Sequence, residues 1–259
     1  MSARYFAAAL LSGSVVCFAR GAQGEAESTA WLTDVSVAAQ NSTETRLAYE
    51  HQQADIKAPA EGIDVAQLGL QAGLGYDLAL APEFAFSQRG EEPLRLESVG
   101  LELRWRILER VAWPELMLYG AYRNDLGEAR DHLARAGLAA CYAWGPWFVN
   151  GDMRPTLNLG GDLGTTLESF WGLAAGYALG SPWHAWAGLE GFVIVPLVGE
   201  RLRDPSFGQG ATSSTAYLGP SLGFEVGPFW TSASAVTGYL VSTQGSQFML
   251  RWLVGVAHD

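Results

Sequence analysis

The chain has 259 residues and a formal net charge of −11, and it contains 10 Trp, 9 Tyr, 11 Phe and 31 Gly. The acidic balance excludes a nucleic-acid partner, because binding to phosphates needs a basic surface. The many glycine and aromatic residues favour strands and tight turns over helices. Of the two cysteines, Cys17 lies in the N-terminal leader and would be removed with it, so Cys141 is the sole cysteine expected in the mature protein. This excludes an internal disulfide framework and a cysteine metal cluster, and we expect neither a metal nor a cofactor.

The N-terminal 24 residues are typical of a secretory signal peptide. Arg4 supplies positive charge, residues 7–19 are mostly small and apolar, and Ala22-Gln23-Gly24 offers small residues for cleavage. Residues 25–42 form an extension of unknown role. They could lengthen the first strand, form a separate stub, or tuck into the interior of the fold that follows.

From residue 43 to 259 the chain alternates between apolar and polar residues. The clearest segment is 97–108, where Leu101 and Leu103 alternate with Glu102 and Arg104. Successive side chains of a strand point to opposite faces, so this segment has one apolar and one charged face. Segments of this kind predict twelve strands, over about 43–52, 64–76, 78–87, 95–108, 115–123, 132–144, 147–161, 167–179, 183–197, 215–226, 229–241 and 247–257.

The connections between these segments alternate between short and long. The short ones are 76–77, 109–114, 145–146, 180–182 and 227–228, and longer polar stretches separate the other neighbours. No run downstream of the leader reaches the about 18 to 20 consecutive apolar residues of a membrane helix, so spanning a membrane would require strands. An even number of strands, with short turns at one end and long loops at the other, predicts an all-β, up-and-down antiparallel transmembrane barrel.

Alternation alone does not say which face points outward, since a soluble barrel with an apolar interior has the same period. Aromatic residues near the short-turn end resemble the interfacial girdle of a membrane barrel. We therefore place the apolar face in lipid. The girdle candidates are Tyr76, Trp105, Trp113, Tyr142, Trp144, Trp147, Phe148, Tyr177, Trp183, Phe224, Phe229, Trp230 and Trp252.

Four prolines stand inside the predicted strands, at Pro82, Pro155, Pro196 and Pro220. Each removes a hydrogen-bond donor from the ladder between strands, and a closed barrel has no edge strand to accommodate it. We expect bulges or strand ends at these positions.

If the apolar face meets lipid, the opposite face lines the lumen with charges of both signs. Arg104, Arg106, Arg135 and Arg154 would oppose Glu102, Asp152 and Glu190. Such a lining can pair and brace the wall, or it can set a field that selects solutes. The lumen-lining candidates are Arg46, Glu50, Gln71, Glu102, Arg104, Arg106, Arg123, Arg135, Asp152, Arg154, Asn158, Glu168, Glu190 and Arg251.

With segments such as LRLESVGLELRWRIL and FWGLAAGYALGSPWHAWAGLEGF, the organisation of 43–259 resembles Gram-negative outer-membrane β-barrels. More loosely, it resembles the small twelve-stranded transporters related to those of aromatic-compound degradation. The resemblance implies an outer-membrane location in a Gram-negative bacterium, with outer-membrane lipid and small solutes as partners. The C-terminus departs from that pattern, because Val256-Ala257-His258-Asp259 lacks the usual final aromatic residue.

No catalytic constellation stands out. The histidines are His51, His132, His184 and His258, and none lies in a setting similar to the outer-membrane phospholipases or lipid A deacylases. Asp131-His132 would need a second acidic pair to act as a protease. We therefore expect a non-enzymatic passive channel or transporter for small solutes. A structural or adhesive barrel with an occluded lumen and partner-binding loops stays open, a hydrolase is least favoured, and the oligomeric state is not predicted.

Overall fold

The computed structural model describes residues 38–53, 62–90, 92–108, 114–126, 132–159, 165–180, 184–198, 214–240 and 246–258. The expected signal peptide lies outside these ranges. Twelve strands follow one another: β1 (Thr43–Gln53), β2 (Ile63–Gly75), β3 (Leu78–Arg89), β4 (Arg95–Leu108), β5 (Glu115–Asp125), β6 (His132–Trp144), β7 (Trp147–Leu159), β8 (Thr165–Gly180), β9 (Ala185–Val198), β10 (Thr215–Val226), β11 (Phe229–Leu240) and β12 (Ser246–His258).

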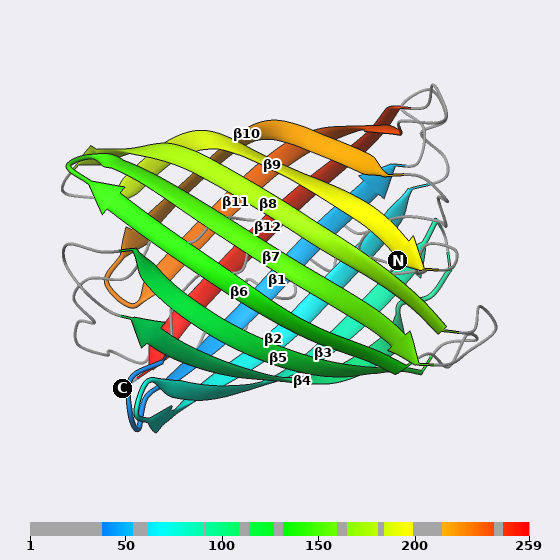
Figure 1. Cartoon of the computed structure of the whole chain (residues 1–259), viewed down its shortest axis with the longest axis horizontal. Helices are drawn as coiled ribbons and strands as arrows, with labels where there is room; N and C mark the ends of the chain where they lie inside the picture. The colour runs from blue at the N-terminus through cyan, green and yellow to red at the C-terminus, as the bar shows by residue number, and fades with distance from the viewer. Residues whose placement is uncertain are drawn as a thin grey trace.

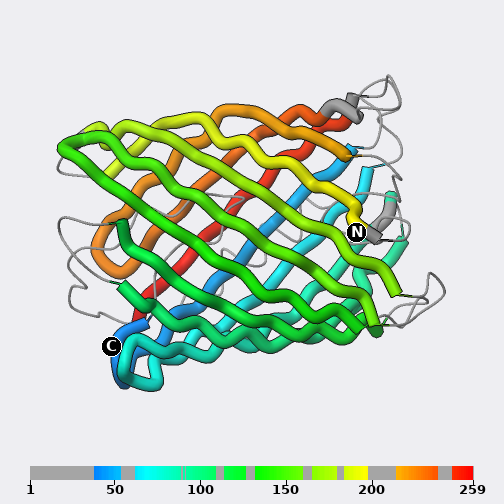
Figure 2. The backbone as a smooth tube through the Cα atoms, viewed as in Figure 1, coloured from blue at the N-terminus to red at the C-terminus, as the bar shows by residue number. Residues whose placement is uncertain are grey.

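The strands form one closed antiparallel barrel in which each strand pairs with its neighbours in sequence, and β12 closes the barrel on β1 (Figure 1). Figure 2 shows the backbone of the strands running obliquely around the barrel, as closure of a sheet requires. The predicted up-and-down barrel of twelve strands is therefore confirmed, and the predicted boundaries differ by at most two residues at any strand end.

Tight turns join the strands at the end of the barrel where β1 begins and β12 ends, a junction marked by the pair Thr43 and His258. Tyr76 and Asp77 both have positive φ values, 54° and 58°. Two successive residues of this kind match the twist of a two-residue β-hairpin. Gly145 and Gly227 take φ values of 58° and 60° in two further turns, where glycine adopts the left-handed region without strain.

The two faces of the wall have opposite chemistry. On β4, Leu101, Leu103 and Trp105 are 48%, 47% and 48% exposed, whereas Glu102 and Arg104 are 5% and 6% exposed. This apolar-out, polar-in arrangement belongs to a barrel that meets lipid, so the alternative of a soluble barrel with an apolar interior is wrong. Within the described ranges no helix is long and apolar enough to cross a membrane.

Most of the aromatic girdle is where the sequence predicts it. The large exposed aromatics near the short-turn end are Tyr76, Trp105, Tyr142, Trp144, Trp147, Tyr177 and Trp252.

Two girdle predictions are wrong. Phe148 and Trp230 are only 3% and 9% exposed, because each shares the inward face of its strand. Phe224 and Phe229 are half-buried and lie 6.0 Å apart between ring centroids. Trp113 and Trp183 lie outside the described residues.

The prolines interrupt the ladders, but the expected bulge is present only beside Pro196; at the other three prolines, all inside strands, the register is the same on both sides of the gap. Pairing between neighbouring strands skips the positions of Pro82 on the β2 side, Pro155 on the β6 side and Pro220 on the β11 side. Pro196 lies directly before the bulged residue at a register shift between β8 and β9. Each proline therefore lies where its missing donor costs the barrel little, at a gap or a bulge.

Candidate functional site: the lumen wall

The structure places the lumen-lining candidates on the inward face of their strands. Nine are buried, namely Glu50, Gln71, Glu102, Arg104, Asp152, Arg154, Asn158, Glu168 and Glu190. Five arginines are half-buried, namely Arg46, Arg106, Arg123, Arg135 and Arg251. A role of these residues in the passage of solutes stays a prediction.

Acidic and basic residues two positions apart form ion pairs along three strands. Because positions i and i+2 share a face, both side chains of each pair point into the lumen. The arginine Nε lies 2.8 Å from the carboxylate in Glu44–Arg46, 2.5 Å in Glu102–Arg104 and 3.2 Å in Asp152–Arg154. These three arginines are therefore neutralised locally by neighbouring acids.

Two further pairs join separate segments of the chain. Arg251 Nε lies 3.9 Å from Glu50 Oε2 across the β1–β12 pairing. Arg106 Nη2 lies 2.8 Å from Asp77 Oδ1 in the turn between β2 and β3. These contacts brace the wall across strand boundaries.

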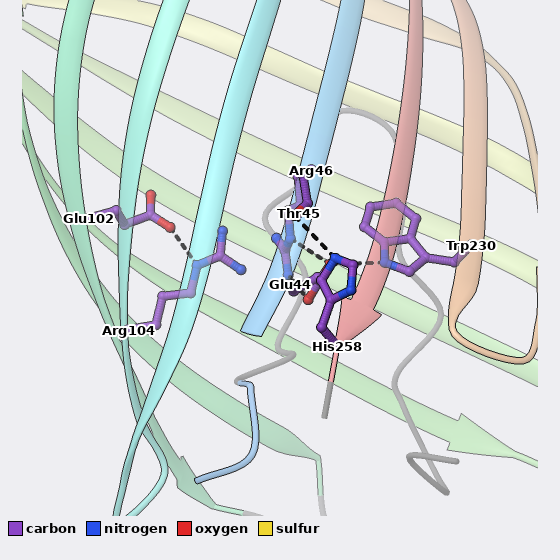
Figure 3. Close-up of polar contacts among 7 residues, drawn as sticks. All are labelled: Glu44, Thr45, Arg46, Glu102, Arg104, Trp230 and His258. Carbon is purple, nitrogen blue, oxygen red and sulfur yellow. Dashed lines mark hydrogen bonds and ion pairs between the residues drawn. The ribbon is translucent and has the colours of Figure 1, made fainter. Parts of the chain in front are cut away.

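A cluster of Glu44, Arg46 and Trp230 joins β1 to β11 where the barrel closes (Figure 3). Trp230 Nε1 donates a hydrogen bond of 2.9 Å to Glu44 Oε1, and the Arg46 guanidinium carbon lies 5.7 Å from the Trp230 ring centroid. Trp230 belongs to β11 and Glu44 to β1, with β12 between them. The ring can cross β12 because its direct partner there is Gly255.

The same arrangement recurs around the wall. An inward aromatic ring lies over the glycine that pairs directly with it on the next strand, where any Cβ would overlap the ring. A ring held in this way lies along the wall and does not project across the lumen. The pairs are Tyr119 with Gly137, Phe148 with Gly176, Trp186 with Gly223, Tyr217 with Gly238 and Trp230 with Gly255.

A row of stacked side chains continues across β7 to β10. The Arg154 guanidinium lies 3.7 Å from the Phe170 ring centroid. Phe170 stacks on Phe192 at 5.1 Å, and Phe192 stacks on Tyr217 at 4.6 Å between centroids. Tyr217 in turn donates a hydrogen bond of 2.5 Å to Gln247 Oε1. This part of the inner wall therefore combines an apolar surface with polar groups at both ends.

We expect Gly137→Ala to destabilise the barrel by about 1 to 3 kcal/mol, the usual cost of overpacking. The new methyl group would overlap the Tyr119 ring, whose hydroxyl donates a 2.8 Å hydrogen bond to Asp152 Oδ1. Gly120→Ala on β5 is the matched control, because its nearest neighbour is the Arg135 carbonyl oxygen at 3.9 Å. Urea titrations in lipid vesicles measure both changes, and equal costs would contradict the close packing of ring on glycine.

The histidines do not gather into one site. His51 Nδ1 lies 2.8 Å from Asp64, which also accepts a 2.7 Å hydrogen bond from Tyr49. His132 contacts Tyr122 at 2.7 Å, and His258 contacts Thr45 at 3.3 Å. Among the residues that the structure describes, no group of three or more His, Cys, Asp or Glu could hold a metal ion.

Several solved structures share this fold at low sequence identity. An outer-membrane channel from Pseudomonas putida F1 is 13% identical, with a TM-score of 0.59 and coverage of 86% of this chain and 98% of that chain. The NanC porin is 10% identical, with a TM-score of 0.52 and coverage of 82% and 98%. LpxR from Salmonella typhimurium is 11% identical, with a TM-score of 0.52 and coverage of 82% and 99%.

No protein-family model and no curated protein matches the sequence. The likeness to solved structures therefore concerns the fold, and it agrees with the apolar outer face and the polar inner face of the wall. The chain is a twelve-stranded β-barrel of the outer-membrane type.

Proposed function

We propose that the barrel is a passive channel for small solutes. The observation that carries this proposal is the arrangement of side chains on the inner wall. Charged side chains pair along the wall, and aromatic rings lie over glycines. Both arrangements hold large side chains beside the strands. Eight-stranded barrels are filled by side chains, and those with sixteen or more strands hold water channels, so twelve strands suit a narrow passage.

Two of the similar structures are an outer-membrane channel and the NanC porin, which supports the proposal. LpxR also has this fold, and a shared fold by itself does not determine a function. The chemistry of the wall suggests which solutes would pass. Carboxylates and guanidinium groups stand beside the aromatic row, a mixed surface suited to small polar or charged molecules that carry an apolar part.

We expect discrete conductance steps from the purified chain in planar bilayers. Replacing Arg46 and Arg106 with Gln together should shift the reversal potential in a salt gradient toward cation preference. Their side chains are 17% and 19% exposed on the inner wall near the short-turn end, and removing positive charge from a narrow mouth changes its field.

Arg95→Gln is the control, because Arg95 is exposed at the other end of β4 and should have a smaller effect on the reversal potential. Heat-modifiable gel mobility shows that each variant is folded. A folded barrel that never conducts would overturn the channel.

We propose no enzymatic role. Among the described residues, His51 contacts an acid, whereas His258 and His132 contact hydroxyl groups elsewhere on the barrel, so these contacts do not unite a nucleophile, a base and an orienting acid in one place. Hydrolysis of lipid or peptide substrates by the purified barrel would contradict this.

A further inference from the structure

The inner wall of β7 and β8 carries three pairs of directly opposed residues, all six of them buried. Partners of this kind share a face of the sheet, with their Cβ atoms about 4.5 to 5.5 Å apart. The pairs follow one another from the middle of the barrel toward the end opposite the short turns, here called the long-loop end, where β7 stops and β8 starts. They are Arg154 with Phe170, Thr156 with Glu168, and Asn158 with Thr166.

The pair nearest the long-loop end has polar groups without partners. Asn158 is 0% exposed and Thr166 is 1% exposed. Neither the amide nitrogen nor the amide oxygen of Asn158 has a hydrogen-bond partner among the described residues, and the Thr166 hydroxyl has none there either. A buried polar group without a partner costs free energy, and proteins accept such local costs mainly at functional sites. These two side chains are therefore the best-marked place for a ligand on the inner wall.

The pair nearest the middle of the barrel is different, because its groups already have partners. The Arg154 guanidinium lies 3.7 Å from the Phe170 ring centroid, and its Nε lies 3.2 Å from Asp152 Oδ2. Phe192 stacks on Phe170 from the next strand. With an arginine from β7 on one side and a second ring from β9 on the other, Phe170 offers a solute little surface for stacking. Recognition at this wall thus depends on the polar groups of the other two pairs.

The donors and acceptors of those two pairs match the hydroxyl groups of a neutral solute. The amide of Asn158 both donates and accepts hydrogen bonds, and so do the hydroxyls of Thr156 and Thr166. An ion of either sign would use only the donors or only the acceptors. A sugar hydroxyl also donates and accepts, so adjacent hydroxyls of one ring can pair with side chains that stand side by side on β7 and β8. Glu168 adds a strong acceptor between them and the middle of the barrel.

We propose that Thr156, Asn158, Thr166 and Glu168 form a subsite that binds small polyhydroxylated solutes such as monosaccharides. The four side chains point inward, so sugars of lipid headgroups outside the barrel cannot reach them and the ligand is a free solute. Because Asn158 and Thr166 are closed off from water, the ligand moves neighbouring side chains aside as it binds. A role of the subsite in passage rests on the proposed channel function, whereas binding itself does not.

The double variant Asn158→Leu, Thr166→Val removes the polar groups and keeps the approximate shape of both side chains. Its urea midpoint of unfolding should equal or exceed that of the parent, since apolar groups of similar shape replace unpartnered polar ones. Asn150→Leu is the matched control, because Asn150 lies on the same face of β7, 4% exposed, near the short-turn end. Heat-modifiable gel mobility shows that each variant is folded. A lowered midpoint of the double variant would mean that the two groups are satisfied, and would overturn the subsite.

Binding is measured without any need for conductance. A ligand that binds only the folded barrel raises its midpoint of unfolding. Glucose at millimolar concentration, below the range in which sugars act as osmolytes, should raise the midpoint of the parent and of Asn150→Leu. The shift should fall several-fold or vanish in the double variant. Tetrahydropyran, which has the same ring without hydroxyl groups, should leave the midpoint of all three proteins unchanged.

Glucose entry into proteoliposomes then separates the subsite from the channel. Entry at low glucose concentration should be several-fold slower through the double variant than through Asn150→Leu, with ion conductance retained by both. A glucose-dependent midpoint in a barrel that never conducts supports the subsite and overturns the channel. Conductance without any glucose-dependent midpoint overturns the subsite and leaves the channel intact. Equal responses to glucose in Asn150→Leu and in the double variant, or equal responses of the parent to glucose and tetrahydropyran, would also refute the subsite.

Discussion

Leu103→Arg should destabilise the folded barrel by about 2 to 4 kcal/mol, the cost of placing an arginine on the lipid face near the bilayer midplane. Leu103 lies in the central part of β4 and is 47% exposed on the apolar outer face. Its direct partners on the neighbouring strands are Leu80 and Gly120, so the substitution breaks no ion pair or hydrogen bond within the wall. Urea titrations in lipid vesicles, followed by tryptophan fluorescence, measure the change.

Ile107→Arg is the matched control for depth in the membrane. It lies on the same strand and the same face, 36% exposed, but close to the short-turn end. Near the interface the same arginine should cost only about 0 to 1 kcal/mol, because its guanidinium can reach water and lipid headgroups. If both variants lose the same stability, or if Ile107→Arg loses more, the lipid assignment of the outer face is wrong.

The fold could be predicted from the sequence because the side chains on the two faces of a membrane barrel differ strongly in polarity. On β4 every second residue from Leu101 to Ile107 is large and apolar, and the residues between them include Glu102 and Arg104. Such a pattern predicts that a strand forms and also restricts its register, since a slip by one residue would place arginines in lipid. Turn residues such as Gly145 and Gly227 then set the strand ends.

Aromatic residues were harder to place, because their chemistry suits both faces. Trp230 follows a short turn like the girdle residues, yet it faces inward and bonds to Glu44 on β1. Two signals in the sequence point to this outcome. Trp230 shares strand parity with Ser232 and Ser234, and Glu44 stands two residues before Arg46, which places it on the inward face.

The pairing of rings with glycines could not be predicted from one sequence. Whether Tyr217 meets Gly238 depends on the register between β10 and β11, which only the complete set of turns and bulges fixes. The same holds for the row from Arg154 to Tyr217, whose members come from four different strands. Alternation predicts the face of a residue, whereas its neighbour across the ladder depends on register.

Arg104→Leu should destabilise the barrel by about 3 to 5 kcal/mol, because it leaves the carboxylate of Glu102 buried without its partner. Arg104 Nε lies 2.5 Å from Glu102 Oε1, and both side chains are 7% exposed. The double variant Glu102→Leu, Arg104→Leu should recover most of that loss, since replacing both members of a buried pair with apolar residues is often neutral. The free energies of unfolding of both single variants and the double variant form a complete mutant cycle.

The surroundings of this pair make the cycle informative about the lumen. The direct ladder partners of Glu102 are Ala81 and Ala121, and those of Arg104 are Ala79 and Tyr119, so none of the four carries a charge. A coupling energy of several kcal/mol would mean that little water reaches this level of the wall. A cost below about 1 kcal/mol for Arg104→Leu is the behaviour of a solvated pair. That result would contradict the buried pair and mean that a water-filled passage extends along β4, because only solvent could then stabilise the unpaired carboxylate.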